Sequence, residues 1–500
     1  MKVFFTISLA VLIFIGSTMA YMIFAGQKEN PELQSNDDRA DTINKNKHSY
    51  WAYSYGSVDF EGEGSAIQQT TDGGYIIAGT IIFDEEKTFN DFWVIKLHDN
   101  GTIAWQKAYG EKGYDRCEAI QQTTDGGYIV VGETYSFGDG NGAIWVLKLR
   151  NDGTIAWQKT YGGNARWYYA SSIRQTTDGG YILSGGTNPI TSSYSYKTDD
   201  LLVLKLNADG TVEWQRTYSG LMNELGSSIQ QTPDGGYILS GQTQLGYRNS
   251  DIWLLKLDKN GQIIWQKAYG GWDRDGVGSV QQTSDGGYIV TGVISPFRVQ
   301  WVDTWILKIK NDGAVEWQKC YGGDKVDVVG SIQQTPDGGY VVAGTTSSFG
   351  NGNNDIWVLK LRNDGTVVWQ KTYGGKRDDD AEMIQQIPDG YIMVGSVLDE
   401  ELQGENQASV LKNYSMLVLK IDKDGLIPSI PSLGVDTKVS PQEAKYFPVK
   451  ESPWESEMIE RRYYTYDDTH VIPRNVNVIV KDTNVKPVDT KAAIMKWPSK

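Results

Sequence analysis

Apolar and polar residues alternate with a period of two along most of the chain, which is the pattern of β-strands. The stretch SIQQT, the glycine turn DGGY and the β-branched stretch YIVVG predict two antiparallel strands joined by a tight turn. After a variable connection, DIWVLKL predicts a third strand, a turn such as Asn151-Asp152-Gly153 follows, and TIAWQKTYGG predicts a fourth. Each unit therefore predicts a four-stranded antiparallel sheet.

This unit occurs seven times. The tetrapeptide DGGY recurs at intervals of 51 to 56 residues, and a shortened form, PDGY, ends the series; the aspartates are Asp72, Asp125, Asp178, Asp234, Asp285, Asp337 and Asp389. Residues 149–163 and 361–375 are almost identical, because they are the same part of two units. A fixed period of this length is typical of stacked supersecondary units that cannot bury their apolar surface alone.

The ends of the chain indicate how the units are arranged. The tryptophan of the fourth strand is absent from the seventh unit, where Lys423-Asp424-Gly425 leads into LIPSIPSLG; the other six are Trp105, Trp157, Trp214, Trp265, Trp317 and Trp369. The missing W-x-x-x-Y-G frame stands instead at Trp51 to Gly56. We expect this first strand to complete the last sheet, since ring closure removes exposed sheet edges. The predicted fold is all-β, a seven-bladed β-propeller over residues 49–426.

The segments outside the ring differ in composition. Residues 1–26 form a long uncharged run after Lys2, which is typical of a signal peptide or an N-terminal membrane anchor, and the sequence leaves both open. Residues 27–48 are polar and predict a flexible linker. Residues 427–500 hold eight of the fourteen prolines and predict an extended or partly ordered tail, in which DTKVSP at 436–441 is echoed by DTNVKP at 482–487.

Charge and composition exclude some functions. The formal net charge of -15 disfavours nucleic acid and anionic lipid surfaces as partners. The two cysteines, Cys117 and Cys320, lie in different units and predict free thiols. The three histidines lack ligand spacing, so no metal site is predicted from them.

The repeat resembles a known group of proteins. Units of the form S-I-Q-Q-T-x-D-G-G-Y, D-x-W-V-L-K-L and D-G-x-x-x-W-Q-K-x-Y-G-G resemble the secreted bacterial and archaeal β-propeller repeat proteins over some 380 residues. The resemblance implies an extracellular or cell-envelope setting and transfers no catalytic residue. The D-G-x-x-x-W piece is also similar to the tryptophan-docking segment of pyrroloquinoline-quinone propellers, but the chain lacks their adjacent cysteine pair, so no cofactor is predicted.

Candidate binding residues lie in the connections that vary between units. We expect the turns between strands one and two, and three and four, to share one face, and the variable connections to share the other. Aromatic residues there depart from the repeat and could stack on sugars or anchor a protein partner; they are Trp167, Tyr168, Tyr169, Trp272 and Trp301. The alternative is that they fill gaps between irregular loops.

Acidic residues recur before the first strand of five units, namely Asp115, Glu224, Asp275, Asp327 and Asp379. They predict either an acidic collar around the central mouth or a set of turn caps that accept backbone N–H bonds. Asp378, Asp379 and Asp380 together are a weak candidate for a calcium site, since no full set of alternating oxygen ligands is present.

The sequence thus favours a non-enzymatic recognition or scaffold protein of the cell envelope or extracellular space that binds a protein or a glycan through the variable-loop face. The alternative is a glycan-cleaving or redox enzyme whose site lies at the central mouth. The sequence does not determine the oligomeric state.

Overall fold

The computed structural model describes residues 50–427 apart from short connections, together with three pieces of the tail at 479–482, 488–489 and 493–495. The connections outside the described residues are 57–60, 83–89, 112, 138–140, 163–165, 190–198, 219–222, 247–248, 271–274, 295–301, 351, 375–376 and 399–413. The predicted leader and linker, residues 1–48, also lie outside them. No helix among the described residues is long and apolar enough to cross a membrane.

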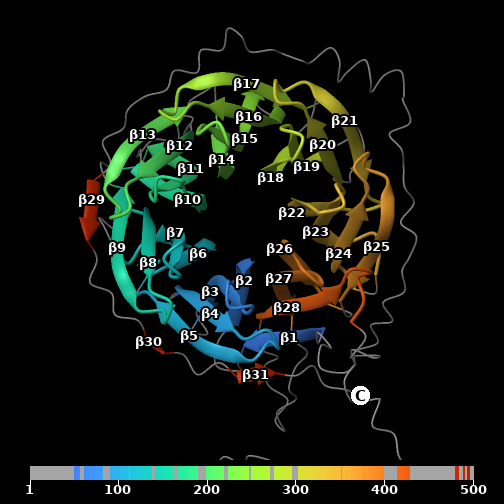
Figure 1. Cartoon of the computed structure of the whole chain (residues 1–500), viewed down its shortest axis with the longest axis horizontal. Coiled ribbons are helices and arrows are strands. Elements are labelled where there is room, and N and C mark those ends of the chain that lie inside the picture. Colours follow the sequence, from blue (N-terminus) through green and yellow to red (C-terminus); the bar gives the residue numbers. More distant parts are fainter. Residues whose placement is uncertain are drawn as a thin grey trace, which may run out of the picture. The chain divides into compact units, whose positions relative to one another are not determined.

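The described strands form seven four-stranded antiparallel blades arranged as a ring, as predicted (Figure 1). Blades 1 to 3 consist of β2 (Glu61–Gln69), β3 (Tyr75–Ile82), β4 (Asn90–Leu97) and β5 (Ile103–Tyr109); β6 (Asp115–Gln122), β7 (Tyr128–Thr134), β8 (Ala143–Leu149) and β9 (Ile155–Gly162); and β10 (Arg166–Gln175), β11 (Tyr181–Pro189), β12 (Asp200–Leu206) and β13 (Val212–Tyr218). Blades 4 and 5 consist of β14 (Glu224–Gln231), β15 (Tyr237–Gly246), β16 (Asn249–Leu257) and β17 (Ile263–Tyr269); and β18 (Gly276–Gln282), β19 (Tyr288–Ile294), β20 (Asp303–Ile309) and β21 (Val315–Tyr321).

The last two blades show how the ring closes. Blade 6 consists of β22 (Asp327–Gln334), β23 (Tyr340–Thr346), β24 (Asp355–Leu361) and β25 (Val367–Tyr373), and blade 7 of β26 (Asp379–Ile387), β27 (Gly390–Leu398), β28 (Tyr414–Asp422) and β1 (Trp51–Gly56). Strand β1 pairs antiparallel with β28, from Trp51 opposite Lys420 to Tyr55 opposite Met416. The prediction that the first strand completes the last blade is confirmed.

The DGGY turn is fixed by the lysine of strand three. In blade 2, Asp125 accepts hydrogen bonds from the Thr123 hydroxyl (2.5 Å), the Gly127 N–H (3.0 Å) and the buried Nζ of Lys148 (3.0 Å). Burial would raise the pKa of Asp125, but these donors outweigh it and lower the pKa to about 2. The equivalent lysine–aspartate ion pair occurs in blades 1 to 6 and, at 3.6 Å, between Lys420 and Asp389 of blade 7. This explains why DGGY and WVLKL recur together.

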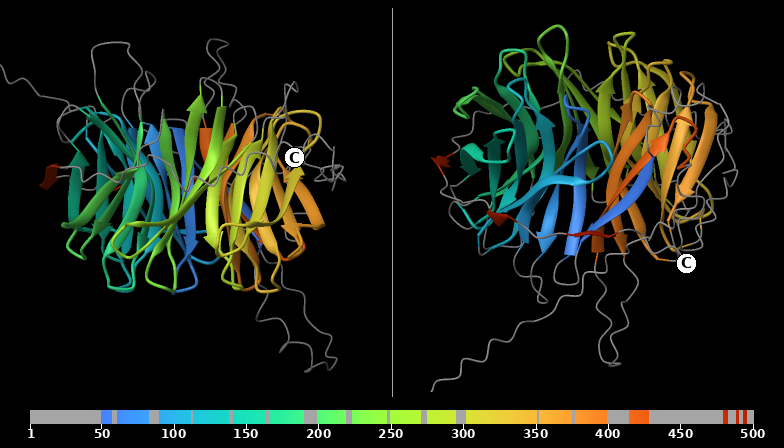
Figure 2. Two further views of the ribbon diagram at one scale, coloured as in Figure 1. Left: turned by 90° about the horizontal axis from the view of Figure 1, so that it is seen from above. Right: turned by 60° about the horizontal axis from the view of Figure 1, so that its bottom comes forward.

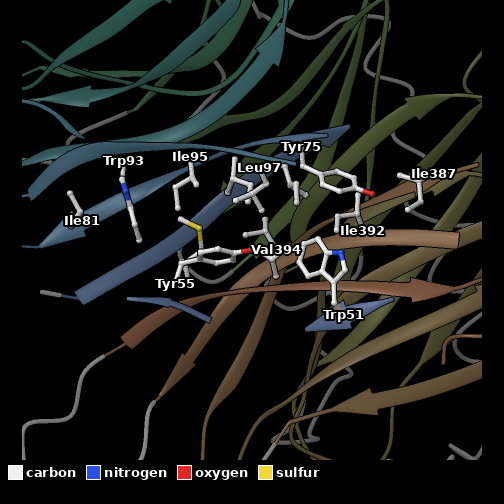
Figure 3. Packing of buried hydrophobic residues seen from close by; sticks show 14 of the residues in the cluster. Trp51, Tyr55, Tyr75, Ile81, Trp93, Ile95, Leu97, Ile387, Ile392 and Val394 are labelled. Carbon is white, nitrogen blue, oxygen red and sulfur yellow. The ribbon is translucent and has the colours of Figure 1, made fainter. Parts of the chain in front are cut away.

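Neighbouring blades are joined by the aromatic residues of the outer strand. The indole of Trp105 packs edge-on against Tyr128 of the next blade, with ring centroids 6.0 Å apart, and its N–H donates to the Asn151 carbonyl. The Tyr109 hydroxyl donates to the carbonyl of Gly153, 2.6 Å away. Figure 3 shows the apolar side of such a junction, where Trp51, Tyr55 and Val394 of blade 7 pack near Tyr75 and Trp93 of blade 1.

The tail adds three short strands to the rim of the ring: β29 (Ile479–Asp482), β30 (Val488–Asp489) and β31 (Ala493–Met495). They pair antiparallel with the outer strands of blades 2, 1 and 7 respectively, which makes these three sheets five-stranded (Figure 1).

Candidate functional site

The two faces of the ring are built differently. Glycines with positive φ form the tight turns between strands one and two and between strands three and four, for example Gly126 (φ 82°) and Gly153 (φ 77°). These short turns gather on one face of the wheel (Figure 2). The other face carries the first residues of the innermost strands and the last residues of the second strands, as where Asp115 lies opposite Thr134 in the β6–β7 register.

The five carboxylates singled out in the sequence are all buried. Asp115, Glu224, Asp275, Asp327 and Asp379 are at most 2% exposed and lie at or next to the start of the innermost strands. Four of them lie close to the carboxylate of an aspartate from strand three of the preceding blade. This is shown by the glycine beside each pair: a Cβ added at Gly110, Gly270, Gly322 or Gly374 would contact both carboxylates. The four pairs are Asp91 with Asp115, Asp251 with Asp275, Asp303 with Asp327, and Asp355 with Asp379.

The repeat shows that the two carboxylates of a junction occur together. Asp200 and Glu224 occupy the equivalent positions between blades 3 and 4. At the two remaining junctions neither residue is acidic: they are Ala143 with Tyr168, and Ser415 with Gly62. Burial first, and then the charge of the paired aspartate, raises the pKa of Asp91 to about 7 and that of Asp303 to about 6.

Two of these carboxylates, Asp115 and Asp327, accept hydrogen bonds from hydroxyls of their own blade and from backbone N–H groups. Asp115 accepts from the Thr134 hydroxyl (2.5 Å), the Ser136 hydroxyl (2.7 Å) and two backbone N–H groups. Asp327 accepts the equivalent bonds from Thr346, Ser348 and the N–H of Gly323. This is the turn-capping arrangement, which the sequence offered as the alternative to an acidic collar. No group of three or more His, Cys, Asp or Glu residues in the described part of the chain is placed to hold a metal ion.

The candidate aromatic residues separate into three groups. Tyr168 is fully buried in the core between blades 2 and 3, and both it and Trp167 lie in strand β10, not in a loop. Trp167 and Tyr169 are half-buried, their ring centroids are 5.0 Å apart, and the Trp167 indole N–H donates to the Glu133 carboxylate. Trp272 and Trp301 lie outside the described residues.

Trp167 belongs to a larger group at the variable face of blades 2 and 3, which we call the mouth cluster: Tyr114, Arg116, Glu118, Glu133, Tyr135 and Trp167. Tyr114 and Tyr135 are 40% and 38% exposed, and their rings meet edge-on at 5.9 Å. Glu133 lies opposite Arg116 in the β6–β7 register and accepts hydrogen bonds from Trp167 and Tyr135. An Arg116 guanidinium nitrogen lies 3.1 Å from a Glu118 carboxylate oxygen.

Charge is unevenly distributed around the axis. Besides Glu118, the alternate positions of the innermost strands place Glu63 of blade 1 and Glu382 of blade 7 within electrostatic range of Arg116. The equivalent positions of blades 4 to 6 hold uncharged residues such as Leu225, Gly278 and Val328. Burial first, opposed by Arg116 and reinforced by Glu382, Glu133 and Glu63, raises the pKa of Glu118 to about 7.

Most residues of the mouth cluster were not predicted from the sequence. Arg116 and Glu118 lie in a strand that repeats in every unit, whereas the candidate aromatic residues came from the variable connections. The available signal was a departure from the repeat at alternate strand-one positions: Glu118 stands where the other units have Ser65, Ser171, Ser227, Gly278, Gly330 and Glu382.

Comparison with known proteins supports the fold. A family model described as a domain of unknown function (DUF5122) beta-propeller matches residues 335–367, within blade 6. The family match and the seven-bladed ring together support a propeller repeat protein. No curated protein matches the chain.

Three solved structures illustrate the likeness. A puromycin hydrolase mutant complexed with PGG is 11% identical with a TM-score of 0.43, covering 67% of this chain and 50% of that one, so the chain spans about half the length of that structure. The Neurospora crassa Pan2 WD40 domain is 9% identical (TM-score 0.42; 75% and 97% covered). The phage phi92 endosialidase is 7% identical (TM-score 0.40; 75% and 69% covered). Likenesses this distant carry no argument about function.

Proposed function

We propose that the protein is a non-enzymatic recognition protein of the cell envelope or extracellular space and that it binds a glycan at the mouth cluster. The propeller fold fits a binding or scaffold role. The observation that carries the proposal is the pairing of partly exposed aromatic rings with a hydrogen-bonded carboxylate on the variable face. Aromatic rings can stack on the apolar faces of sugar rings, while carboxylates and guanidinium groups accept from and donate to hydroxyls.

The setting is inferred from the chain start. The uncharged run from Val3 to Gly26 supports export or anchoring, and the net charge of -15 fits a neutral or basic ligand better than a polyanion. A segment of an envelope protein is the other partner class compatible with the mouth cluster.

The test is binding of the full chain to an array of envelope polysaccharides, followed by titration calorimetry on the best ligand. Trp167→Ala should weaken binding at least tenfold, because truncating a well-packed aromatic anchor costs about 2 kcal/mol and 1.4 kcal/mol corresponds to a factor of ten. Val326→Ala is the matched control, since Val326 is an exposed apolar residue (38%) in a connection leading into the innermost strand of blade 6. Equal affinities of the two variants would reject the mouth cluster as the binding site.

One observation favours a second candidate, a glycan-cleaving enzyme. A carboxyl whose pKa lies near 7 retains its proton near neutral pH, as a general acid in glycoside hydrolysis must, and Glu118 meets this condition. Release of reducing ends from a bound polysaccharide by the wild-type chain, and its loss in Glu118→Gln, would establish this activity in place of simple recognition.

A further inference from the structure

The three tail strands pair with the ring at the same position of the repeat. Their paired positions include Lys481 opposite Thr160 of β9, Val488 opposite Ala108 of β5, and Met495 opposite Ser54 of β1. Thr160, Ala108 and Ser54 are the same position of the repeat, three residues after the outer-strand tryptophan. The tail therefore advances one blade for every seven residues.

The shared register also places residues of opposite charge at facing positions. In β29, Asp482 is the register partner of Lys159, and in β30, Asp489 is the register partner of Lys107. Both lysines belong to the recurring WQK motif. Opposite charges at directly facing positions favour one register of antiparallel strands over others.

Four outer strands present the same edge without a fifth strand among the described residues: β13, β17, β21 and β25. Each carries a basic residue at the WQK position, namely Arg216, Lys267, Lys319 and Lys371. The outer edge of a strand offers a row of backbone donors and acceptors with which a further strand can pair.

The path of the chain leads first to β25. After β28, Ile427 packs against the same apolar cluster as Trp369 of β25, so the tail starts beside blade 6. The three docked strands then run from blade 2 to blade 1 to blade 7, against the order of the blades (Figure 1). A tail that follows this direction throughout passes blades 6, 5, 4 and 3 before it reaches β29.

The sequence supplies a segment suited to the first of these edges. The tetrapeptide Val-Asp-Thr-Lys occurs at 488–491, where its first two residues form β30, and again at 435–438. The second copy begins eight residues after Ile427. Residues 428–478 number 51, more than the roughly 28 that four steps of seven residues require.

We propose that the outer edge of β25 is a docking edge for residues 435–438 of the same chain, with Val435 facing Thr372 and Asp436 facing Lys371. The segment up to 478 continues over β21, β17 and β13, and the tail forms a belt around the rim. Both faces of the ring stay free for ligands.

Disulfide trapping tests the register. Facing residues of antiparallel strands have Cα atoms about 4.5–5.5 Å apart, within the range that a disulfide spans. The full chain with Cys320→Ser receives Asp436→Cys and Lys371→Cys, is oxidised mildly, blocked with N-ethylmaleimide and analysed on non-reducing gels. Buried Cys117 is retained. Asp489→Cys with Lys107→Cys is the positive control, and Asp436→Cys with Lys319→Cys, one blade further, is the register control.

The expected result is a monomeric species of altered mobility for the 436–371 pair, at a yield near that of the 489–107 pair and several-fold above that of the 436–319 pair. A cross-linked dimer would identify a second copy as the occupant of the edge and overturn the proposal. It would equally be overturned by no cross-link where the positive control forms one, by equal yields for Lys371 and Lys319, or by failure of all three pairs.

Discussion

The closing strand makes the same hydrogen bond as every other blade, and this allows a matched test of ring closure. In each outer strand a tyrosine hydroxyl donates to the carbonyl of a turn glycine in the next blade, over 2.6 to 2.8 Å. In blade 7 the donor is Tyr55, contributed by the start of the chain, and the acceptor is Gly101 of blade 1. The perturbation is Tyr55→Phe, compared with Tyr161→Phe in the continuous blade 2.

The structure sets the magnitude. The Tyr55 and Tyr161 side chains are fully buried, so the substitution removes a buried donor and leaves a glycine carbonyl without this bond. A hydrogen bond contributes about 0.5–1.5 kcal/mol net and an orphaned buried acceptor costs about 1–3 kcal/mol, so each variant should lose about 1–2 kcal/mol. With an unfolding entropy of roughly 2.1 cal/mol/K per residue over about 380 residues, the melting temperature should fall by about 1–3 °C.

Calorimetry and urea unfolding of the full chain measure the loss. Tyr53→Phe is the control, because Tyr53 lies in the same strand and is only partly buried. We expect equal losses for Tyr55→Phe and Tyr161→Phe, and a change within about 0.5 kcal/mol for Tyr53→Phe. If Tyr55→Phe were as neutral as Tyr53→Phe while Tyr161→Phe destabilised, the first strand would not complete the last blade and the closure argument would fail.

Three further predictions follow from the repeat. The raised pKa of Asp91 means that the folded chain binds a proton at this carboxyl more tightly than the unfolded chain. The stability that this proton contributes is therefore present below about pH 4 and is lost as the pH rises through about 7. Asp91→Asn should raise the melting temperature at pH 8 and leave it unchanged at pH 4, and a melting temperature that depends on pH in the same way in variant and wild type would reject this. Lys148→Met removes the 2.9 Å ion pair of a buried lysine and should cost about 1–3 kcal/mol in urea unfolding, against no measurable loss for the exposed Lys423→Met. Gly153→Ala should destabilise more than Gly126→Ala in the same assay, because both adopt positive φ but only at Gly153 would a Cβ meet a tryptophan ring, 2.9 Å away.

The fold was predictable because its signals are local and repeated. Strand alternation, turn glycines and a tryptophan every 51 to 57 residues sufficed to count the blades, and the absence of that tryptophan after Lys423 indicated the circular closure. The DGGY aspartate was assigned only to a turn. Its ion pair with the strand-three lysine spans 22 to 31 residues and depends on which way the lysine side chain points, which the sequence pattern does not determine.

The site was less accessible to prediction for a related reason. Asp115 and its equivalents recur, and a recurring acidic residue is compatible with either an exposed collar or a buried cap. Only the three-dimensional arrangement places four of the five beside a second carboxylate from the preceding blade, as Asp91 is placed beside Asp115. Tyr168 departs from the repeat for a packing reason, since it fills the space opposite Ala143 at a junction without carboxylates.

These two kinds of departure from the repeat can be distinguished physically. Where a residue changes together with its partner across a junction, as Tyr168 does with Ala143, both are buried and the change conserves packing. Arg116, Glu118 and Glu133 also depart from the repeat together, but within one blade: Glu133 lies opposite Arg116, and the Arg116 and Glu118 side chains remain partly exposed, so packing does not require the change. A symmetric ring does not need such an asymmetry for stability. The charged residues of blades 7, 1 and 2 and the aromatic residues of blades 2 and 3 are not explained by packing of the ring. Ligand binding at this part of the ring would explain them.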